Sequence, residues 1–202
     1  MKTTTINREL FFDAVRAKLF GGTLKSAQFE GLTVIIDYYL SHYTDLHWLA
    51  YVLATAYHET AKTMQPIDEH GTDKYFFEMY DMNGKRPKVA KDLGNSFPGD
   101  GVRYHGQGYV QLTGRANYAT MGKLFGVDLV KNPTLAKLPS LAAKVLVEGM
   151  TRGMFTGRKL ADYFIGAKED ALNARRIING VDCNVVIAGY YRHFLAALHP
   201  TL

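Results

Sequence analysis

Apolar residues recur at helical spacing through the first sixty positions and predict three amphipathic helices. The first covers Glu9–Leu19 and stops at a pair of glycines. Ser26 is the expected N-cap of the second helix, which runs to Ser41. Asp45 is expected to cap the third helix, Leu46–Thr60, whose small alanine side chains allow neighbouring helices to pack closely.

The pattern changes between Met64 and Arg103, where five glycines and three prolines interrupt a polar segment. This composition predicts loops and short turns rather than long helices. Such a long stretch without regular structure is uncommon in a compact domain unless it has a function. Tyr109–Thr113, just beyond it, is predicted to form a short strand.

Helical spacing then resumes to the end of the chain, so the sequence predicts a mainly α fold. We expect a single domain over residues 1–202, with no separate wall-binding domain, because a chain of this length can bury one sizeable core, in two lobes. Asp182 is the expected cap of the last helix, and Cys183 beside it is expected to be a small core residue. The predicted later helices are Asn117–Phe125, Leu141–Phe155, Lys159–Ile165, Ala171–Ile178 and Val185–Leu198.

Charge and composition narrow the possible partners. The net charge of +5 suits an anionic partner, but the basic residues form no long run, which argues against a nucleic-acid-binding arm. The longest apolar stretch, Leu32–Leu40, is too short to span a bilayer and contains Asp37, so we expect no stable membrane insertion. The single cysteine excludes an intramolecular disulfide.

Two motif fragments fail when their spacing is checked. His58–Glu59 begins like a zinc-protease motif, but the second histidine would fall at Lys62. Gly106–Gln107–Gly108 begins like a dinucleotide-binding loop, but the third glycine would fall at Gln111, and a strand rather than a helix is expected to follow. We therefore expect neither a metal nor a cofactor.

Glu59 is the strongest candidate for catalysis, because it ends an apolar helix where burial disfavours a charged carboxyl group. A general acid must keep its proton near neutral pH, and glycoside hydrolysis pairs such a group with an ionised carboxylate. The alternative is that Glu59 only caps the helix or forms an ion pair. The candidates for the ionised partner, in the polar segment that follows, are Asp68, Glu69, Glu78 and Asp81.

Tyrosine and amide side chains cluster soon after the polar segment and could line a sugar groove. Amides hydrogen-bond hydroxyl and N-acetyl groups, and tyrosine rings stack on sugar faces. The alternative is that the tyrosines belong to the core and its rim. Asn179 is similarly open to two interpretations, since it could simply end a helix. The clustered residues are Tyr104, Tyr109, Gln111, Asn117 and Tyr118.

Four motifs together resemble the family 19 glycoside hydrolases, and within them the phage and prophage endolysin branch. They are Ala56–Ala61 (AYHETA), Met64–Ile67 (MQPI), Tyr104–Thr113 (YHGQGYVQLT) and Asn173–Gly180 (NARRIING). The resemblance runs in order over nearly the whole chain, from Phe11 to Leu198. Any one motif alone would be only moderately specific.

The resemblance implies a lysozyme-like, two-lobed fold, with the loop-rich segment and a short β element at a substrate cleft, and an inverting mechanism. Glu59 matches the general acid of the family. Thr113 matches a hydroxyl residue that helps to hold the attacking water. The remaining matched or clustered residues are expected to contact the glycan, and they are His58, Tyr104, Gln111, Asn117, Tyr118, Arg176 and Asn179.

The general base stays open at this point. An acid at the position of Glu69 is usual in the endolysin branch, but Asp68 stands beside it where a basic residue is more common. In plant chitinases of the family the base lies farther along, nearer Asp81. Inversion needs about 6.5–9.5 Å between the two carboxyl groups, which leaves room for the water.

The sequence thus predicts an endolysin that hydrolyses β-1,4 bonds of peptidoglycan as a muramidase, acting as a monomer and causing host lysis. The first ten residues show no secretion signal, so we expect it to wait in the host cytoplasm until a holin opens the membrane, although a secreted effector also fits. The alternatives are a chitinase, a lytic transglycosylase, and an inactive wall-binding protein on the same scaffold.

Overall fold

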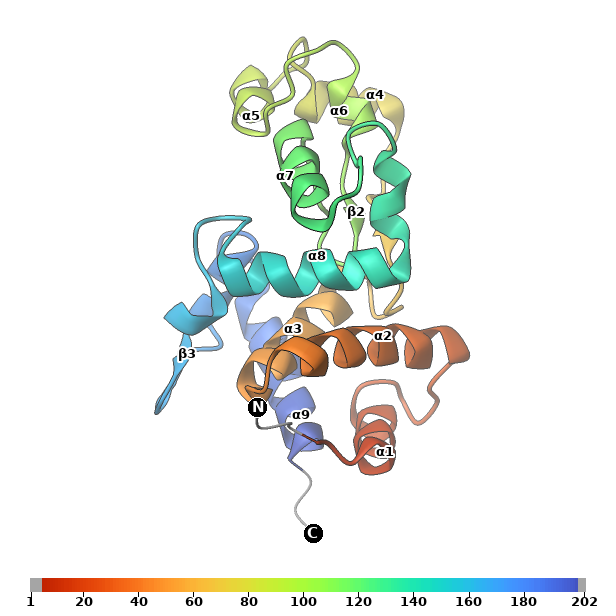
Figure 1. Ribbon diagram of the computed structural model, residues 1–202, viewed down its shortest axis with the longest axis vertical. Helices are drawn as coiled ribbons and strands as arrows, with labels where there is room; N and C mark the ends of the chain where they lie inside the picture. Colours follow the sequence, from red (N-terminus) through yellow and green to blue (C-terminus); the bar gives the residue numbers. More distant parts are fainter. Residues whose placement is uncertain (1–4, 200–202) are drawn as a thin grey trace. The chain divides into compact units, whose positions relative to one another are not determined.

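A computed structural model describes residues 5–199, and within this range the chain is mainly helical (Figure 1). Two compact units account for the described residues. The terminal unit comprises residues 5–65 and 146–199, and the central unit comprises Pro66–Val145. Two units agree with the two lobes expected from the sequence.

The terminal unit is built around the helix α3, Leu46–Glu59, which packs against α9, Asn184–Leu198. The helices α1, Arg8–Lys18, and α2, Ser26–His42, lie against this pair. The unit also contains the end of α8, Pro139–Arg152, which begins in the central unit. Its remaining elements are the 3-10 helices η2 (Leu160–Asp162) and η3 (Asn173–Ile177) and the paired strands β3 (Phe164–Ile165) and β4 (Lys168–Glu169).

The sequence explains why α3 occupies the core. The Asp45 side chain accepts hydrogen bonds from the backbone N–H groups of His47 and Trp48, which confirms the expected N-cap. Ala50, Ala54 and their neighbours are fully buried, because small side chains let another helix approach closely. The α3 helix can therefore be surrounded by other elements and still end at a partly exposed glutamate.

The central unit has more helix than the sequence predicted. The segment expected to form loops contains α4, Asp73–Tyr80, α5, Pro87–Asp92, and α6, Asp100–Arg103. The Thr72 side chain caps α4 by accepting a hydrogen bond from a backbone N–H. The glycine and proline content limits helix length here rather than preventing helices. The other helices of the unit are α7 (Arg115–Phe125) and the 3-10 helix η1 (Pro133–Lys137).

The strand predicted at Tyr109–Thr113 is wrong in its position. The strand β2 is Gln107–Gly108, and it pairs antiparallel with β1, Ile67–Asp68. Gln107 and Leu112 exchange backbone hydrogen bonds of 3.2 and 2.8 Å, which close a tight loop over the residues expected to be extended. The left-handed backbone of Gln111, with φ of 55°, is part of this loop.

Several predicted details near helix ends are also corrected. Lys25, not Ser26, is the N-cap of α2, and the Gln28 side chain accepts from its backbone N–H. Lys159–Ile165 forms only a short 3-10 turn and a strand. Cys183 rather than Asp182 caps α9, and Cys183 is exposed rather than in the core.

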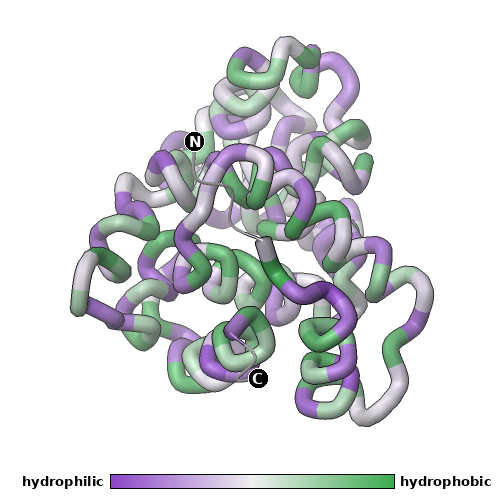
Figure 2. The backbone as a smooth tube through the Cα atoms, turned by 60° about the horizontal axis from the view of Figure 1, so that its bottom comes forward, coloured by the Kyte–Doolittle hydropathy of each residue, from purple (hydrophilic) through white to green (hydrophobic). Residues whose placement is uncertain are grey.

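Hydrophobic and hydrophilic residues alternate along the helical coils in Figure 2, as amphipathic helices require. Among residues 5–199, no helix combines the length and the apolar character that a membrane crossing would demand. The expected absence of membrane insertion stays a prediction.

Candidate active site

Glu59 is the last residue of α3, and its side chain is only 16% exposed. Oε1 of its carboxylate accepts a hydrogen bond from Nη1 of Arg175 in the 3-10 helix η3. No other described residue donates to the carboxylate, so Oε2 receives no hydrogen bond from residues 5–199. One carboxylate oxygen is thus held by a cation, and the other is left for a ligand.

Arg175 is almost completely buried, with a side chain 4% exposed. Its Nη2 also donates to Oδ2 of Asp182 at 3.1 Å, and its Nε donates to the Asp182 carbonyl at 3.3 Å. Burial alone would lower the pKa of Arg175, but the charges of Glu59 and Asp182 raise it above its usual value. The guanidinium therefore stays charged and fixes the position of the Glu59 carboxylate.

The turn after Glu59 has an unusual backbone that depends on Gly31. Ala61, Lys62 and Met64 all have positive φ, which L-residues rarely adopt. The Thr60 hydroxyl accepts a 3.0 Å hydrogen bond from the Met64 N–H and helps to hold this conformation. A Cβ on Gly31 would lie 1.7 Å from the Met64 carbonyl oxygen, so only glycine allows α2 to pack against the turn.

Glu69 lies in the central unit, directly after β1, and is partly exposed. Its Oε1 accepts from the Tyr80 hydroxyl at 2.8 Å, and its Oε2 accepts from the Gly106 N–H at 3.1 Å. Burial and the Glu69 charge raise the pKa of Tyr80, so that hydroxyl stays protonated and can donate. A Cβ on Gly106 would be 3.0 Å from the same carboxylate, so any larger residue there would push the Glu69 side chain aside.

Asp68 has different partners, a lysine and a histidine. Its Oδ2 is 2.6 Å from the Lys137 ammonium nitrogen, and its Oδ1 is 3.3 Å from His105 Nε2. The His105 ring is in turn stacked on Phe76, with centroids 4.5 Å apart. Burial alone would raise the pKa of Asp68, but the hydrogen bonds and charges of Lys137 and His105 outweigh it and lower that pKa.

Asp81 is fully buried, unlike the two carboxylates above. Its Oδ2 accepts from the N–H groups of Gly99 and Gly101 at 2.8 and 3.2 Å, and its Oδ1 accepts from Asn83 at 3.1 Å. A carboxylate with three backbone donors and no exposure organises loops and is closed to a substrate. This geometry argues against Asp81 as the general base.

Gln111, Thr113 and Asn117 lie together in the central unit. Gln111 Nε2 donates to the carbonyls of Ile67 and Gly108 at 3.2 and 3.3 Å, which ties its loop to the β1–β2 pair. The Thr113 hydroxyl donates to the Gln111 carbonyl at 2.8 Å, and Asn117 Nδ2 donates to the Thr113 carbonyl at 2.7 Å. All three side chains are partly exposed, and the Thr113 oxygen can still accept a hydrogen bond.

Tyr104 and Tyr118, which the sequence suggested as sugar contacts, are buried in the central unit. Their exposed fractions are 1% and 0%. The Tyr104 hydroxyl donates to the Val130 carbonyl, and the Tyr118 hydroxyl donates to the His105 carbonyl, both at 3.0 Å. These rings serve the core, and in this structure neither face is open to a sugar.

Three more candidates lie in the terminal unit. His58 is partly exposed beside Tyr190, with ring centroids 6.4 Å apart. Asn179 is exposed, and its side-chain oxygen accepts from the Gly180 N–H at 2.9 Å. Arg176 is exposed, whereas its neighbour Arg175 contacts Glu59. Sequence reasoning missed Arg175, although both arginines stand in the same motif.

The structure therefore groups the candidates within each unit. Glu59 stands with Arg175 and Asp182 in the terminal unit. In the central unit, Gly106 donates to Glu69 just before β2, and Thr113 donates to Gln111 just after it. Within residues 5–199, no three His, Cys, Asp or Glu side chains gather in a way that could hold a metal ion. The carboxyl groups of Glu59 and Glu69 could each exchange a proton with a polar substrate.

Comparison with known proteins places this geometry in context. No protein-family model matches the chain. An endochitinase of Arabidopsis thaliana is 29% identical over 133 residues, which is 61% of this chain and 47% of the relative, so the chain spans about half the length of this curated relative. Chitinase C from Streptomyces griseus aligns with 100% of this chain and 79% of its own, at 17% identity and a TM-score of 0.60. A bacterial family 19 chitinase aligns with 96% of this chain and 94% of its own, at 19% identity and a TM-score of 0.56.

These structural similarities confirm the expected fold class. The chain has the mainly α, lysozyme-like fold of the family 19 chitinases, with short strand pairs. At identities below one fifth the similarity establishes the fold, and the activity has to be argued from the side chains.

Proposed function

We propose that this chain, which has the fold of a family 19 chitinase, is a glycoside hydrolase that cleaves β-1,4 bonds of bacterial peptidoglycan with inversion. The observation that carries the proposal is the end of α3, where Glu59 is held by the buried Arg175 with one carboxylate oxygen unoccupied. The distant endochitinase and the two chitinase structures support the same reaction class.

Glu59 acts as the general acid in this proposal. In this role Glu59 must carry a proton on Oε2, the carboxylate oxygen to which no residue among 5–199 donates a hydrogen bond. Oε2 donates the proton to the glycosidic oxygen, because Oε1 is held by Arg175. The guanidinium then compensates the negative charge that Glu59 acquires, which makes the proton transfer less costly.

Glu69 acts as the general base, since its partners leave it better suited than Asp68. Lys137 and His105 contact Asp68 and lower its pKa, and a carboxylate with a lowered pKa accepts a proton less readily. Glu69 is held instead by a neutral hydroxyl and a backbone N–H, which orient it without cancelling its charge. In the same central unit, Thr113 has a hydroxyl oxygen that can accept a hydrogen bond from the attacking water.

Separate substitutions of Glu69 and Asp68 should show which of the two is the general base. We expect Glu69→Gln to reduce glycan cleavage by roughly 10²- to 10⁴-fold, because the general base is lost. Asp68→Asn should cause a much smaller loss, since Asp68 mainly anchors β1 through Lys137 and His105. Initial rates on purified peptidoglycan, with the melting temperature of each variant as the folding control, measure both effects.

The reverse order of losses would assign the base to Asp68. If both variants kept nearly full activity, neither acid would be the base and the proposal for the central unit would fail.

In its biological setting, the proposed enzyme is an endolysin that acts as a monomer. It stays in the host cytoplasm until a holin opens the membrane, then degrades the wall and lyses the cell. The four motifs shared with the endolysin branch and the positive net charge, which suits an anionic wall, support this role. Arg176, Asn179 and His58 are proposed to contact the glycan from the terminal unit.

A chitinase is the second candidate, because the similar proteins are named as chitinases. The proton-transfer chemistry is the same for both substrates, so the catalytic groups do not separate them. Cleavage of soluble N-acetylglucosamine oligomers at a rate exceeding that on peptidoglycan would favour the chitinase.

Mass spectrometry of fragments released from purified peptidoglycan tests the proposal directly. Hydrated N-acetylmuramic acid at the reducing ends is expected from an inverting muramidase. Anhydro ends would show a lytic transglycosylase instead. Binding to walls without any cleavage of peptidoglycan or N-acetylglucosamine oligomers would leave only the wall-binding alternative.

A further inference from the structure

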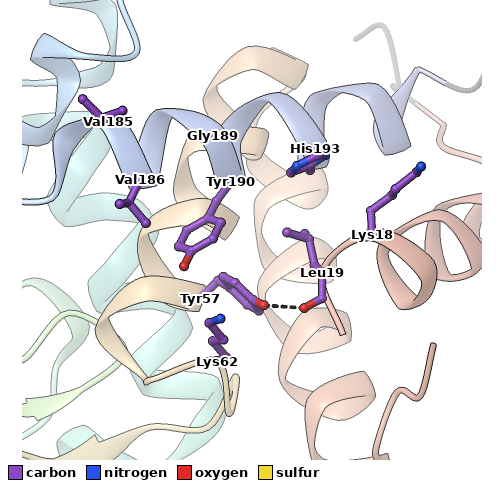
Figure 3. Close-up of a pocket in the computed structure, with 9 residues that line it drawn as sticks. All are labelled: Lys18, Leu19, Tyr57, Lys62, Val185, Val186, Gly189, Tyr190 and His193. Atoms are coloured by element: carbon purple, nitrogen blue, oxygen red, sulfur yellow. Dashed lines mark hydrogen bonds between the residues drawn. The ribbon is translucent and has the colours of Figure 1, made fainter. Parts of the chain in front are cut away.

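A pocket of about 240 Å³ lies in the terminal unit, and neither Glu59 nor Arg175 lines it. Figure 3 shows the residues that form its walls. It is formed by the end of α1, the end of α3 and the first half of α9. Tyr57 contributes to its wall and lies two positions before Glu59 in α3, which places the two side chains about 200° apart around the helix. The pocket therefore opens on a different side of α3 from the catalytic carboxyl group.

The lining of the pocket contains basic side chains and no acid. Lys18, Lys62 and His193 contribute to it, and no aspartate or glutamate does. Among residues 5–199, none of these three side chains has a carboxylate within salt-bridge distance. Most lysines on a protein surface are simply hydrated, but here two of them share one concave site with a histidine and aromatic rings.

Lys62 is held in place more firmly than a typical surface lysine. Its ammonium nitrogen is 5.8 Å from the Tyr57 ring centroid and 5.9 Å from the Tyr190 ring centroid. Its backbone, with φ of 69°, is fixed by hydrogen bonds from Lys62 N–H to the Tyr57 carbonyl and from Gln28 Nε2 to the Lys62 carbonyl. The backbone that carries the Lys62 side chain is thus fixed before any ligand arrives, which reduces the entropy lost on binding.

The two tyrosines give the pocket a rigid wall. Their rings meet edge to face, with centroids 4.8 Å apart. The Tyr57 hydroxyl donates to the Leu19 carbonyl, and burial raises the pKa of Tyr57 to about 12, so this donor stays protonated. The exposed side chains of Val185 and Val186 complete an apolar rim on α9.

We propose that this pocket binds a compact anionic group, a carboxylate or a phosphate, carried by a polymer of the bacterial wall. The volume is below the range of about 300–1,000 Å³ that is typical of sites for whole small molecules, so a single charged substituent fits better than an extended ligand. Lys62 and His193 supply donors for the anion, and Lys18, whose ammonium group points away from Lys62 in Figure 3, adds positive charge at the edge of the pocket. Tyr190 and the valines contact the apolar part of the group that carries the anion.

This inference adds a second binding site to the proposed enzyme, and it rests on the proposed function only in naming a bacterial wall polymer as the source of the anion. Chitin is a neutral polymer, whereas peptidoglycan carries peptide carboxylates, and wall polymers attached to it can carry phosphates. A cationic pocket outside the catalytic residues would therefore add affinity for the wall and none for chitin.

The test measures binding without turnover, in the full chain carrying Glu59→Gln. Calorimetric titration would use three probes: a muropeptide with free carboxylates, a glycerol phosphate oligomer, and a neutral N-acetylglucosamine tetramer. Lys18→Met with Lys62→Met should raise the Kd of an anionic probe by about tenfold, which corresponds to about 1.4 kcal/mol. The Kd of the neutral tetramer should not change.

Lys88→Met with Lys91→Met is the matched control, because it removes the same charge from two exposed lysines of α5. It should leave every Kd unchanged. A loss confined to the muropeptide identifies a carboxylate, and a loss confined to the oligomer identifies a phosphate. The proposal would be overturned if both double variants lost affinity for the anionic probes equally, or if neither lost any. This result does not depend on whether the chain with Glu59 intact is active, so the pocket and the proposed function are tested separately.

Discussion

Changing Glu59 to glutamine is expected to lower the rate of glycan cleavage by roughly 10²- to 10⁴-fold, the range that general acid catalysis contributes. Glutamine keeps the size of the side chain and can still accept a hydrogen bond from Arg175, so the terminal unit should stay folded. It cannot give a proton to the leaving oxygen. Release of reducing ends from purified peptidoglycan, together with the melting temperature, measures the rate and the folding separately.

Glu30→Gln is a suitable control, because Glu30 is exposed on α2 and has no salt bridge among the described residues. It removes the same charge and should leave the rate unchanged. Substantial wall cleavage by a folded Glu59→Gln protein would remove Glu59 from the mechanism.

Changing Arg175 to alanine should affect both stability and activity. The change leaves the Glu59 carboxylate with little exposure and no cation, and breaking a buried ion pair in this way costs about 3 kcal/mol. For a chain of this size, that corresponds to a fall in melting temperature on the order of 10 °C. Activity should fall as well, since nothing then fixes Oε1 or compensates the charge left after proton transfer.

Arg176→Ala provides the stability control within the same short helix. Arg176 is exposed and its side chain makes no ion pair among the described residues, so the melting temperature should barely change. Similar losses of melting temperature in the two variants would contradict the special role that the structure gives to Arg175. Arg175→Lys is expected to recover part of the stability but not the full activity, because an ammonium group cannot reproduce the forked contacts to Glu59 and Asp182.

The identity of the general base could not be decided from the sequence. The sequence left Glu69, Asp68 and Asp81 as alternatives. Their partners distinguish them in the structure, because Asp81 is surrounded by backbone N–H groups and Asp68 is paired with a lysine and a histidine. Those partners come from distant positions, such as Lys137, and no local pattern indicates them.

The sequence by itself determined the features that depend on neighbours along the chain. Periodic apolar residues predicted α1, α2, α3, α7, α8 and α9, and the Asp45 cap was correct because capping is a local interaction. The position of Glu59 at the end of α3 follows from the same pattern. The mainly α fold class could therefore be predicted without any knowledge of tertiary contacts.

Only the tertiary structure decided which side chains are buried and which distant residues they contact. Arg175 rather than Arg176 meets Glu59, in a segment that forms a 3-10 helix instead of the predicted α-helix, and the two partners lie 116 residues apart in the chain. From the sequence, Tyr104 and Tyr118 could be either sugar contacts or core residues, and the structure packs both inside. The strand β2 forms at Gln107–Gly108 because its partner β1 fixes the register. Long-range pairing and burial are properties of the whole fold, so the spacing of residues along the chain could not reveal them.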